Sequence, residues 1–535
     1  MKRYIVIIIA TLALISCNEW LDGTENNTYL TDELVWRDAE SANLYVNGFY
    51  TYIHKYGQFG DYQFGGSMTE SLTDAFKYGS MSLGHKAGHP NDYVVNPEAI
   101  TTAGCLWGIW GTAYENIRRL NGFLDSMQKF SKLPAETNLE LEAQARFFRG
   151  FVYFQLAKRH PKGVILYDTL PTGNDKALSS GEETWQFIYD DLKFAAENLP
   201  AEWKSADNGR VTKYAAYAML SRAMLYAERW NDVIAAADSV INSGRYGLMD
   251  AYKDSWKGGN KESILEFRYN VSGPYHTFDQ DYVPLCDGYD YGALGTPTQE
   301  MVESYERYDG GEFDWTGYHN GTVTSRPNYE SLEPRFAATI IYNGCQWKEQ
   351  TMDCSVGGAK GKFVEYGTVP YSYGMTTTGY FLRKMVDEKH TDLQGVKSTQ
   401  TWVEIRYAEV LLNKAEALYK SGATAYQAPM NEVRARVSLP KKNDTGDAWW
   451  KAYRRERKVE LAYEGHYFWD LRRWQVAHTE LTGYRVHGFK IEGGAFNYIT
   501  CDLKDRRFFS KLYCLPVPDA ELRDNKLAQQ YDEWK

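Results

Sequence analysis

A pair of adjacent amphipathic segments places the strongest constraint on how this chain can fold. Residues 216–243 contain two segments with helical periodicity that meet near Trp230. The first segment carries Leu220 three residues before Ala223, and the second carries Ala237 between two valines. Small side chains let two helices approach closely, while leucine and tryptophan fill the groove between them. The segment is therefore expected to form a helical hairpin.

The same Leu-x-x-Ala step returns much later in the chain, at Leu412 and Ala415. Each copy resembles part of a tetratricopeptide unit, but the two copies lie much further apart than the period of about 34 residues that tandem repeats keep. We therefore expect a mainly α fold. In it, a tetratricopeptide-like helical frame of split repeats carries one large, loop-rich insertion that contains short β-strands. Two unrelated amphipathic helices are the alternative.

Changes in composition mark the expected domains. Helical periodicity, with Pro and Gly at the helix ends, recurs within residues 32–244 and again within 401–535. Residues 245–400 are dense in Gly, Tyr and Asp and have only short β-like runs. We assign 32–244 to an N-terminal helical region, 245–400 to the variable insertion and 401–535 to a C-terminal helical region.

The N-terminus has the pattern of an export signal. Two basic residues precede an apolar run of about a dozen residues, which is shorter than the ~20 helical residues that span a bilayer. The run ends in LISC, which resembles a bacterial lipobox with Cys17 as the lipidated residue. We expect 1–16 to be a lipoprotein signal peptide and 17–31 to be a lipidated tether. An ordinary signal peptide with a chance cysteine is the alternative.

The composition narrows the classes of function. The chain has 535 residues, a formal charge of -10 and a pI near 5.6, which argue against a nucleic-acid partner because phosphates require a basic surface. Its 43% hydrophobic and 24% charged residues match those of globular proteins. Aromatic residues make up 15% of the chain, and its 42 Tyr and 16 Trp together outnumber its 23 Phe. Most of these rings carry a polar group and therefore suit interfaces as well as cores.

Six cysteines follow Cys17 in the sequence. Six in so long a chain are too few for a disulfide scaffold, so we expect mostly buried free thiols. Cys345 and Cys354 are close enough in sequence to bridge a hairpin and are the best candidates for a disulfide.

No standard catalytic signature is present in the chain. H-E-x-x-H, G-x-S-x-G, the Walker A motif and G-x-G-x-x-G are all absent. Two acidic pairs, Asp279 with Asp281 and Asp287 with Asp290, could hold calcium or act as paired carboxylates, although such pairs are common in acidic loops. We therefore expect a protein that is not an enzyme and has no catalytic residues, cofactor or metal, with a structural calcium ion left open.

Several motifs that follow one order along the chain resemble the SusD/RagB family of outer-membrane nutrient-binding lipoproteins. The most specific is RRERKVELAYEGHYFWDLRRW at 454–474. The other matching segments lie at 141–165, 209–216, 296–302, 333–336, 379–384, 406–417 and 515–518. In the segment 454–474, the charges of Arg457, Glu460 and Glu464 fall on one face of a helix, where we expect them to form structural ion pairs.

This resemblance implies a fold, a location and partners. Family members are described as tetratricopeptide-like frames whose variable loops hold the ligand, and they are not enzymes. The chain is then expected to be anchored by lipid in the outer membrane and to face the cell exterior. It would capture oligosaccharides or polysaccharides and deliver them to a SusC-like TonB-dependent transporter.

A sugar ring has an apolar face edged by hydroxyls, so its site needs aromatic platforms with polar side chains beside them. One candidate region is the loop 91–96, at a position that resembles a ligand-contacting loop of the family's starch-binding member but lacks its Trp. The other is the insertion, mainly before the motif at 296–302. The candidates are Asp92, Tyr93, Asn96, Tyr275, Tyr282, Tyr289, Asp290, Tyr291, Trp315, Tyr318, Asn320 and Trp347. Stacking on a few rings predicts weak, reversible binding in the micromolar to millimolar range.

Three other functions stay open. The same fold and transporter could serve peptides instead of glycans. A lipid-anchored glycoside hydrolase could use two loop carboxylates. A repeat adaptor would bind only protein. The loops of the family vary with substrate, so the sequence does not identify the sugar.

Overall fold

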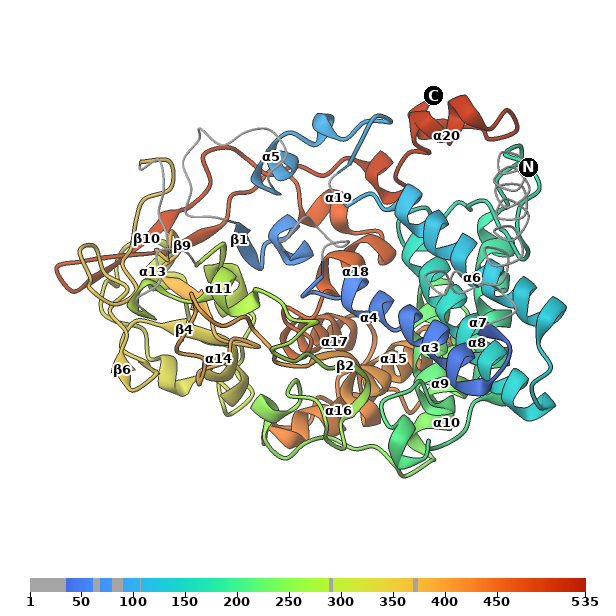
Figure 1. Ribbon diagram of the computed structural model, residues 1–535. Helices are drawn as coiled ribbons and strands as arrows, with labels where there is room; N and C mark the ends of the chain where they lie inside the picture. The colour runs from blue at the N-terminus through green and yellow to red at the C-terminus, as the bar shows by residue number, and fades with distance from the viewer. Residues whose placement is uncertain (1–34, 61–67, 79–89, 106, 288–291, 369–373) are drawn as a thin grey trace, which may run out of the picture.

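The computed structural model describes residues 35–60, 68–78, 90–105, 107–287, 292–368 and 374–535, and Figure 1 shows a helical frame on one side and the insertion on the other. The helices of the frame are α3 (Ala39–Phe49), α4 (Thr51–Tyr56), α6 (Trp110–Phe130), α7 (Ala135–Ala157), α8 (Gly181–Asn198), α9 (Lys213–Tyr226), α10 (Trp230–Ile241), α15 (Tyr407–Lys420) and α16 (Gln427–Arg436). The remaining α-helices are α5 (Pro90–Val95), α11 (Phe278–Tyr282), α12 (Gln299–Val302), α13 (Thr316–His319), α14 (Pro334–Thr339), α17 (Gly446–Glu460), α18 (Tyr467–Arg473), α19 (Ala477–Glu480) and α20 (Asp519–Asp524).

Successive helices of the frame pack against one another. α6 packs on α7, α7 on α8, α8 on α9 and α9 on α10. The neighbour of α10 on its other side is α15, which follows the whole insertion in sequence, and α16 packs on α15 in turn. These contacts confirm a mainly α fold whose helical frame is split by one long insertion.

Local sequence explains why the frame helices form. Ser180 caps α8, where its hydroxyl accepts a hydrogen bond from the backbone N–H of Glu183 and the Glu183 side chain accepts one from the backbone N–H of Ser180. Ala223 on α9 and Ala415 on α15 are fully buried, so the helices approach closely at the repeated Leu-x-x-Ala step.

Among the residues that the structure describes, the strands are short and form five separate two-stranded antiparallel pairs. They are β1 (Phe76–Tyr78) with β3 (Gly295–Pro297), β2 (Ser263–Phe267) with β8 (Trp402–Arg406), β4 (Ile340–Tyr342) with β7 (Tyr380–Leu382), β5 (Gln346–Trp347) with β6 (Gln350–Thr351) and β9 (His487–Glu492) with β10 (Ala495–Thr500). The β2–β8 pair closes the insertion at its base, since it joins a strand near the start of the insertion to the strand that leads into α15.

The hairpin β9–β10 belongs to the C-terminal region in sequence but packs on the insertion (Figure 1). The backbone N–H of Phe489 donates to the carbonyl of Thr378 at 2.9 Å, and that of Phe496 donates to the carbonyl of Thr324 at 2.8 Å. The insertion is therefore completed by residues far beyond its sequence boundary.

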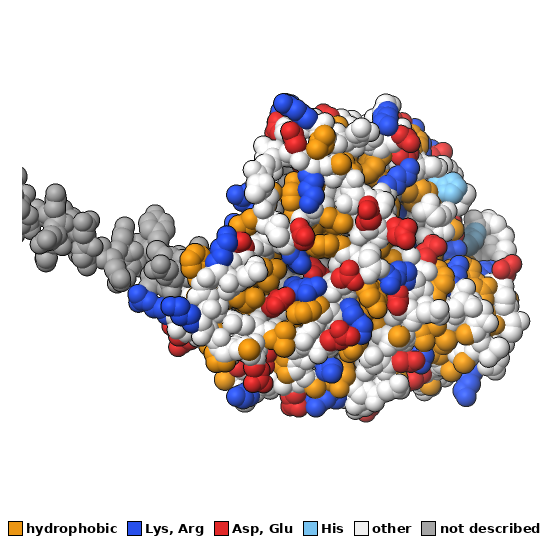
Figure 2. All heavy atoms as spheres, turned by 90° about the vertical axis from the view of Figure 1, so that its right-hand side faces the viewer, with side chains coloured by type: hydrophobic (Ala, Val, Ile, Leu, Met, Phe, Trp, Pro, Cys, Tyr) orange, Lys and Arg blue, Asp and Glu red, His pale blue; other side chains and the backbone are white. Residues whose placement is uncertain are grey.

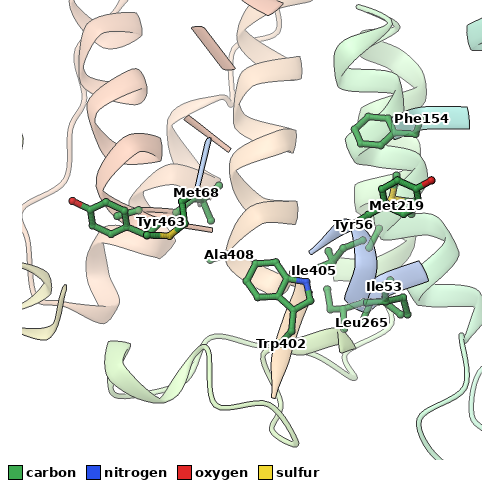
Figure 3. Close-up of a cluster of buried hydrophobic side chains, with 14 of the residues drawn as sticks. Ile53, Tyr56, Met68, Phe154, Met219, Leu265, Trp402, Ile405, Ala408 and Tyr463 are labelled. Atoms are coloured by element: carbon green, nitrogen blue, oxygen red, sulfur yellow. The ribbon is translucent and has the colours of Figure 1, made fainter. Parts of the chain in front are cut away.

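One continuous hydrophobic core runs through the frame and the insertion. Figure 3 shows Trp402 and Ile405 of β8 between Tyr463 on one side and Leu265 and Ile53 on the other. These side chains come from segments throughout the chain, so the two regions share their interior and are held at a fixed relation to each other.

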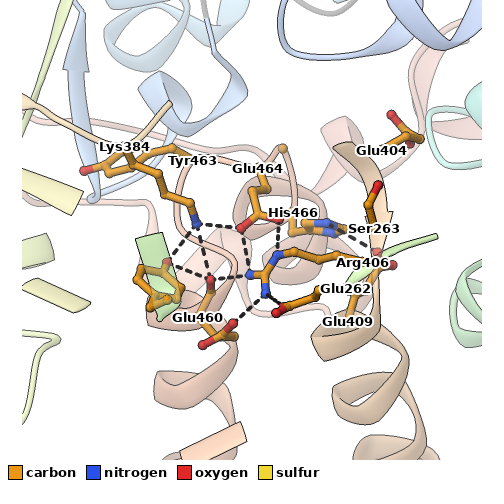
Figure 4. A network of polar contacts seen from close by, with 12 residues as sticks. Glu262, Ser263, Lys384, Glu404, Arg406, Glu409, Glu460, Tyr463, Glu464 and His466 are labelled. Carbon is orange, nitrogen blue, oxygen red and sulfur yellow. Dashed lines mark hydrogen bonds and ion pairs between the residues drawn. The ribbon is translucent and has the colours of Figure 1, made fainter. Parts of the chain in front are cut away.

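A buried network of ion pairs crosses the same junction (Figure 4). Arg406 bonds Glu262 at 2.9 Å, Glu460 at 2.6 Å and Glu464 at 2.7 Å, and Lys384 of the insertion bonds Glu464 at 2.5 Å. All five side chains are buried. The charges at 460 and 464 are therefore structural, as the sequence predicts.

The helical periodicity of residues 447–475 predicts one helix, but the structure has two helices there, α17 and α18. Tyr463 and Gly465 between them have φ angles of 63° and 79°, in the left-handed region that ends a helix. The turn carries Glu464 toward Arg406 and Lys384, which explains why helical periodicity does not continue through it.

The described residues test the predicted disulfide and can be searched for a membrane-spanning helix. Cys345 and Cys354 are both buried and are not joined by a disulfide. Cys17, the predicted signal peptide 1–16 and the whole predicted tether 17–31 lie outside the described residues. Within the part of the chain that is described, we find no helix with both the length and the apolar character needed to cross a membrane.

Figure 2 shows the face of the molecule that carries the frame. Acidic and basic side chains alternate with hydrophobic ones across this face, without a continuous surface of one charge among the described residues. Nucleic-acid binding requires an extended basic surface, which this face does not offer.

Candidate functional site

Four of the predicted aromatic platforms lie in the core. The exposed fractions of Trp347, Tyr282, Trp315 and Tyr318 are 0%, 2%, 6% and 7%. Rings buried to this degree cannot present a face to a sugar, so the structure corrects the prediction that they are open platforms. Their sequence neighbourhood is loop-like, but segments far away in sequence cover them.

Trp315 and Tyr318 lie at α13 between the insertion surface and the C-terminal hairpin. The Trp315 ring is 4.4 Å from the ring of Phe313, and the Tyr318 ring is 5.7 Å from that of Phe489 on β9. The exposed Asn320 follows α13, and its side-chain oxygen accepts hydrogen bonds within its own turn. The structure thus brings these three predicted residues close in one short segment, where the two rings are packed and Asn320 is exposed.

Trp347 and Tyr282 support other parts of the insertion. The indole N–H of Trp347 donates to Asp287 at 3.2 Å, and Lys348 bonds the same carboxylate at 2.9 Å. Tyr282 packs on Phe278 of the same helix at 4.7 Å. Neither ring lies beside Trp315 or Tyr318 in these contacts, so the candidates do not form one platform.

The segment 91–96 is largely helical, because α5 covers Pro90–Val95, which corrects its prediction as a loop. The half-buried ring of Tyr93 packs 5.7 Å from that of Trp107, and Asn96 is exposed. Tyr275, with 49% exposure, is the predicted ring most open to solvent among those described. The Asp92 side chain and residues Tyr289, Asp290 and Tyr291 lie outside the described residues.

An open groove with a volume of about 480 Å³ lies in the insertion next to the buried Trp315. Its size is within the range of about 300–1,000 Å³ that ligand sites occupy. The groove is lined by Arg307, Tyr308, Phe313, Asp314, Asn328, Glu330 and Ser331. Tyr308 has 62% of its surface exposed, so its ring is available for stacking.

Backbone pairing holds Tyr308 at the edge of this groove. Its N–H donates to the carbonyl of Ser331 at 3.0 Å, and the N–H of Glu333 donates to the carbonyl of Glu306 at 2.9 Å. A tight turn then follows, in which Gly310 has a φ of 78° and its N–H donates to the carbonyl of Arg307. The aromatic ring is therefore carried on a fixed turn.

Phe313 links this groove to the buried Trp315. Phe313 is half-buried and lines the groove, while Trp315 packs behind it. Between them, Asp314 accepts a hydrogen bond from the backbone N–H of Thr316 at 3.0 Å, and this bonding lowers the Asp314 pKa. The Trp that the sequence marks as a platform is therefore the support for a neighbouring ring.

The two carboxylates of the groove are ionised at neutral pH. Hydrogen bonds from Thr316 lower the pKa of Asp314. Arg326 bonds Glu330 through two nitrogens, at 2.6 and 2.9 Å, and lowers its pKa as well. The general acid of a glycosidase requires a raised pKa. These carboxylates are suited to accept hydrogen bonds from hydroxyls and not to donate a proton.

The acidic pair Asp279 and Asp281 occupies two different environments. Asp279 is buried and accepts hydrogen bonds from the backbone N–H of Asp387 at 2.8 Å, from His390 at 2.7 Å and from Gln400 at 2.7 Å. Burial raises the pKa of Asp281 to about 6. Over the described ranges, no group of three or more His, Cys, Asp or Glu side chains is arranged to hold a metal ion.

Sequence reasoning missed Tyr308 and Phe313 as groove residues. A signal for Tyr308 was present, because it directly precedes the Asp-Gly-Gly sequence at 309–311. Such residues favour tight turns, whose tips lie at the surface.

Comparison with known proteins gives the family. A family model described as "SusD family" matches residues 261–534, just over half of the 535-residue chain. The chain belongs to the SusD family. A second model, described as "Starch-binding associating with outer membrane", matches residues 19–225, so the N-terminal helical region also has SusD-like character.

Individual relatives agree with this assignment. A SusD-like protein from Bacteroides ovatus is 25% identical over 399 residues, which cover 69% of this chain and 65% of that protein, slightly less than two thirds of its length. A SusD-like protein P25 from Formosa agariphila is 20% identical over 99% of this chain and 98% of that protein.

Solved structures of SusD-like proteins show the same fold. The crystal structure of a SusD-like protein from Bacteroides fragilis has a TM-score of 0.80 and 27% identity, and covers 94% of this chain and 98% of that one. A second one from that organism, described as a SusD-like carbohydrate binding protein, has a TM-score of 0.78 and 25% identity, with coverage of 93% and 100%. The family's helical fold is thus present over nearly the whole chain.

Proposed function

We propose that this SusD-family chain is a cell-surface lipoprotein that binds oligosaccharides without altering them and delivers them to a SusC-like TonB-dependent transporter. The insertion groove is the proposed binding site. A relative of the same fold is described as carbohydrate-binding, and one of the two family models is described as starch-binding and associated with the outer membrane. The lipobox at Cys17 supports the membrane anchor.

The exposed ring of Tyr308 is the observation that carries the proposal. Together with Phe313 it offers aromatic surface to the apolar face of a sugar. Asn328, Glu330 and Ser331 line the same groove and can form hydrogen bonds with hydroxyls. This combination of ring and short polar side chains fits the chemistry of a neutral glycan.

The expected affinity is low. If sugars stack as aromatic pairs do, each ring contributes roughly 0.5–1.5 kcal/mol beyond area burial, so Tyr308 and Phe313 together contribute about 1–3 kcal/mol. A millimolar dissociation constant corresponds to about -4 kcal/mol. Binding in the millimolar to micromolar range suits a protein that must release its ligand to a transporter.

The lowered pKa values of Asp314 and Glu330 count against the rival hydrolase at this groove. Neither carboxyl group is protonated near neutral pH, where a glycosidase needs one as a general acid. We therefore expect the bound oligosaccharide to be recovered intact. Peptide binding by the same groove is left to experiment.

Affinity electrophoresis against a panel of neutral polysaccharides tests the proposal. The wild-type protein should be retarded by at least one polysaccharide, and Tyr308→Ala should weaken that retardation about tenfold, because it removes the exposed platform. The matched comparison is Phe130→Ala, which removes an exposed ring at the end of α6 in the frame and should change little. Chromatography of the glycan after incubation should show no shorter products.

Three results would overturn the proposal. One is a wild-type protein that binds no glycan and instead binds a peptide mixture. Another is glycan binding that is unaffected by Tyr308→Ala. The third is release of shorter sugars by the purified protein, which would establish a hydrolase instead.

A further inference from the structure

The charges that line the insertion groove are not equally offset by their neighbours. The lining includes one arginine, Arg307, and two carboxylates, Asp314 and Glu330. A charge that is already paired within the protein contributes little attraction for a ligand, whereas an unpaired charge remains available to one. The unpaired charges therefore decide which charged group the groove favours on a sugar.

Arg307 and Glu330 are both paired with side chains of opposite charge. Arg307 bonds Asp309 at 2.6 Å. Arg326 bonds both oxygens of Glu330, at 2.6 and 2.9 Å, so this carboxylate is engaged on both sides. These two pairs add no net charge to the groove.

Asp314 is the carboxylate of the groove that has no cationic partner. Hydrogen bonds from Thr316 lower its pKa and keep it ionised at neutral pH. Among the described residues, no lysine or arginine forms an ion pair with it. The basic side chain that acts on it electrostatically is His319, which itself bonds Glu303 at 2.7 Å. The groove therefore keeps one negative charge that is not offset.

Two aromatic rings lie in the same groove as this carboxylate. The ring of Tyr308 is 62% exposed, and the half-buried Phe313 directly precedes Asp314 in the chain. A protonated amine is attracted by the face of an aromatic ring and forms a charge-assisted hydrogen bond with a carboxylate. A neutral substituent gains neither of these charge effects. An exposed ring with an unpaired carboxylate in the same groove is therefore suited to an ammonium group.

The turn that carries Asp314 is held in place by the protein. The backbone N–H of Arg307 donates to the carbonyl of Gly311 at 2.8 Å, which closes the turn before Phe313. Glu312 then bonds Arg455 of α17 at 2.6 Å, which ties the turn to the C-terminal helices. A carboxylate on a fixed turn can be reached by a ligand with little cost of ordering.

We propose that the groove prefers oligosaccharides whose sugar units carry a free, protonated amine over the same oligosaccharides with that amine acetylated. In this view Asp314 is a specificity-determining residue that accepts a hydrogen bond from the ammonium group, while Tyr308 stacks on the sugar ring. The preference rests on the proposed glycan-binding function, for which it names a substrate class at the same site.

Titration calorimetry with matched pairs of oligosaccharides tests this inference. One pair is a glucosamine oligomer and its N-acetylated counterpart, and the other is a galactosamine oligomer and its N-acetylated counterpart. In at least one pair, the free-amine member should bind the wild-type protein at least fivefold more tightly than the acetylated member while the amine is protonated. Added salt should reduce this ratio of affinities, because exposed charges are screened. Titration at a pH at which the amine is neutral should remove it.

Two variants with opposite expected effects make the test specific. Asp314→Asn keeps an oxygen that can accept the hydrogen bond of the turn but removes the charge, so the ratio of affinities should fall to about one. Arg326→Gln leaves Glu330 unpaired in the same groove, so the ratio should rise a few-fold. The matched control is Asp125→Asn, which breaks a pair with Lys129 on α6 of the frame and should leave the ratio unchanged.

The inference fails if the free-amine member of neither pair binds at least fivefold more tightly than its acetylated counterpart, or if the ratio is unchanged in Asp314→Asn. Binding of the neutral polysaccharides, and its weakening in Tyr308→Ala, test the proposed function separately. Neutral binding without a preference for the amine would remove the inference and leave the proposed function standing. Absence of binding by every oligosaccharide and polysaccharide would remove both.

Discussion

The helical frame and the insertion relate sequence to structure in different ways. In the frame, the helical signals are local, as in α8 with its capping box, and neighbours in sequence pack together. In the insertion, the strands are two to five residues long, and several pair over long distances, as β3 does with β1 of the N-terminal region. In the insertion, the solvent exposure of a side chain therefore depends on segments that are distant in sequence, and local composition does not predict it.

Aromatic residues show the same contrast. Frame rings such as Phe148 and Phe151 lie in the part of α7 whose residues are all buried. In the insertion, Trp315 is buried and Tyr308 is exposed, although both lie among polar and glycine residues. The frame gives rigidity, and the insertion places a few exposed rings and carboxylates on that support.

The largest loss of stability is expected when the buried charge of Arg406, which joins the frame and the insertion, is removed. Arg406→Met removes a guanidinium that the buried carboxylates of Glu262, Glu460 and Glu464 share. Arg436 still bonds Glu262 and Glu460, and Lys384 still bonds Glu464. Removing one side of a buried ion pair costs about 3–5 kcal/mol, and urea unfolding should show a loss of about 4 kcal/mol in the free energy of unfolding.

The matched control for Arg406→Met is Glu480→Gln, which breaks the partly exposed pair with Arg454. Such pairs contribute about 0–1 kcal/mol, so little change is expected. Equal losses for the two variants would contradict the view that the frame and the insertion are joined by a buried ionic network.

A somewhat smaller loss is expected inside the insertion. Trp315→Ala removes a buried indole behind Phe313 and should lower the free energy of unfolding by about 3 kcal/mol. It should also weaken neutral-glycan binding, because Phe313 loses its support. Tyr308→Ala should weaken binding without a comparable loss of stability, since exposed side chains away from the core change stability by roughly 0.5 kcal/mol or less. Equal losses of stability in Trp315→Ala and Tyr308→Ala would contradict the view that Trp315 is a buried support and Tyr308 an exposed platform.

The pH dependence of stability should also differ between the two regions. In the insertion, burial raises the pKa of Asp281 from 3.8 to about 6. The ionised form is less favourable in the folded state, so this group lowers stability as pH rises from about 4 to about 6. Asp281→Asn should remove that decline and stabilise the protein at pH 7 by up to about 3 kcal/mol.

The frame group Glu416 acts in the other direction. Burial opposes its ionisation, but Arg473 and Arg457 outweigh this effect and lower its pKa from 4.5 to about 2. Its contribution to stability is present above about pH 4.5 and is lost as pH falls toward 2. Unfolding curves from pH 2 to pH 7 check both groups. An unchanged slope between pH 4 and 6 in Asp281→Asn would contradict the assignment for the insertion.

Much of the fold could be predicted from the sequence, because helical signals are local. The Leu-x-x-Ala steps at 220–223 and 412–415 indicated a split frame, and α10 does pack on α15 across the insertion. The break between α17 and α18 could not be predicted in this way. It depends on Arg406 and Lys384, which lie outside the segment and draw Glu464 out of the helical path.

The candidate site could be predicted only as a region. The insertion was assigned the ligand, and the groove proposed here lies within it. The individual rings could not be chosen, because Trp315 is covered by Phe313 and Tyr318 by a hairpin from residues 487–500. A turn signal such as the Asp-Gly-Gly after Tyr308 predicts the exposure of a neighbouring ring better than aromatic content does.

The most direct test of this account is a crystal structure of the protein with the neutral oligosaccharide that retards it most in affinity electrophoresis. The account predicts a sugar ring stacked on Tyr308, with its hydroxyls within hydrogen-bond distance of Asn328 or Glu330. An ordered oligosaccharide elsewhere on the molecule, with the groove beside Tyr308 empty, would contradict it.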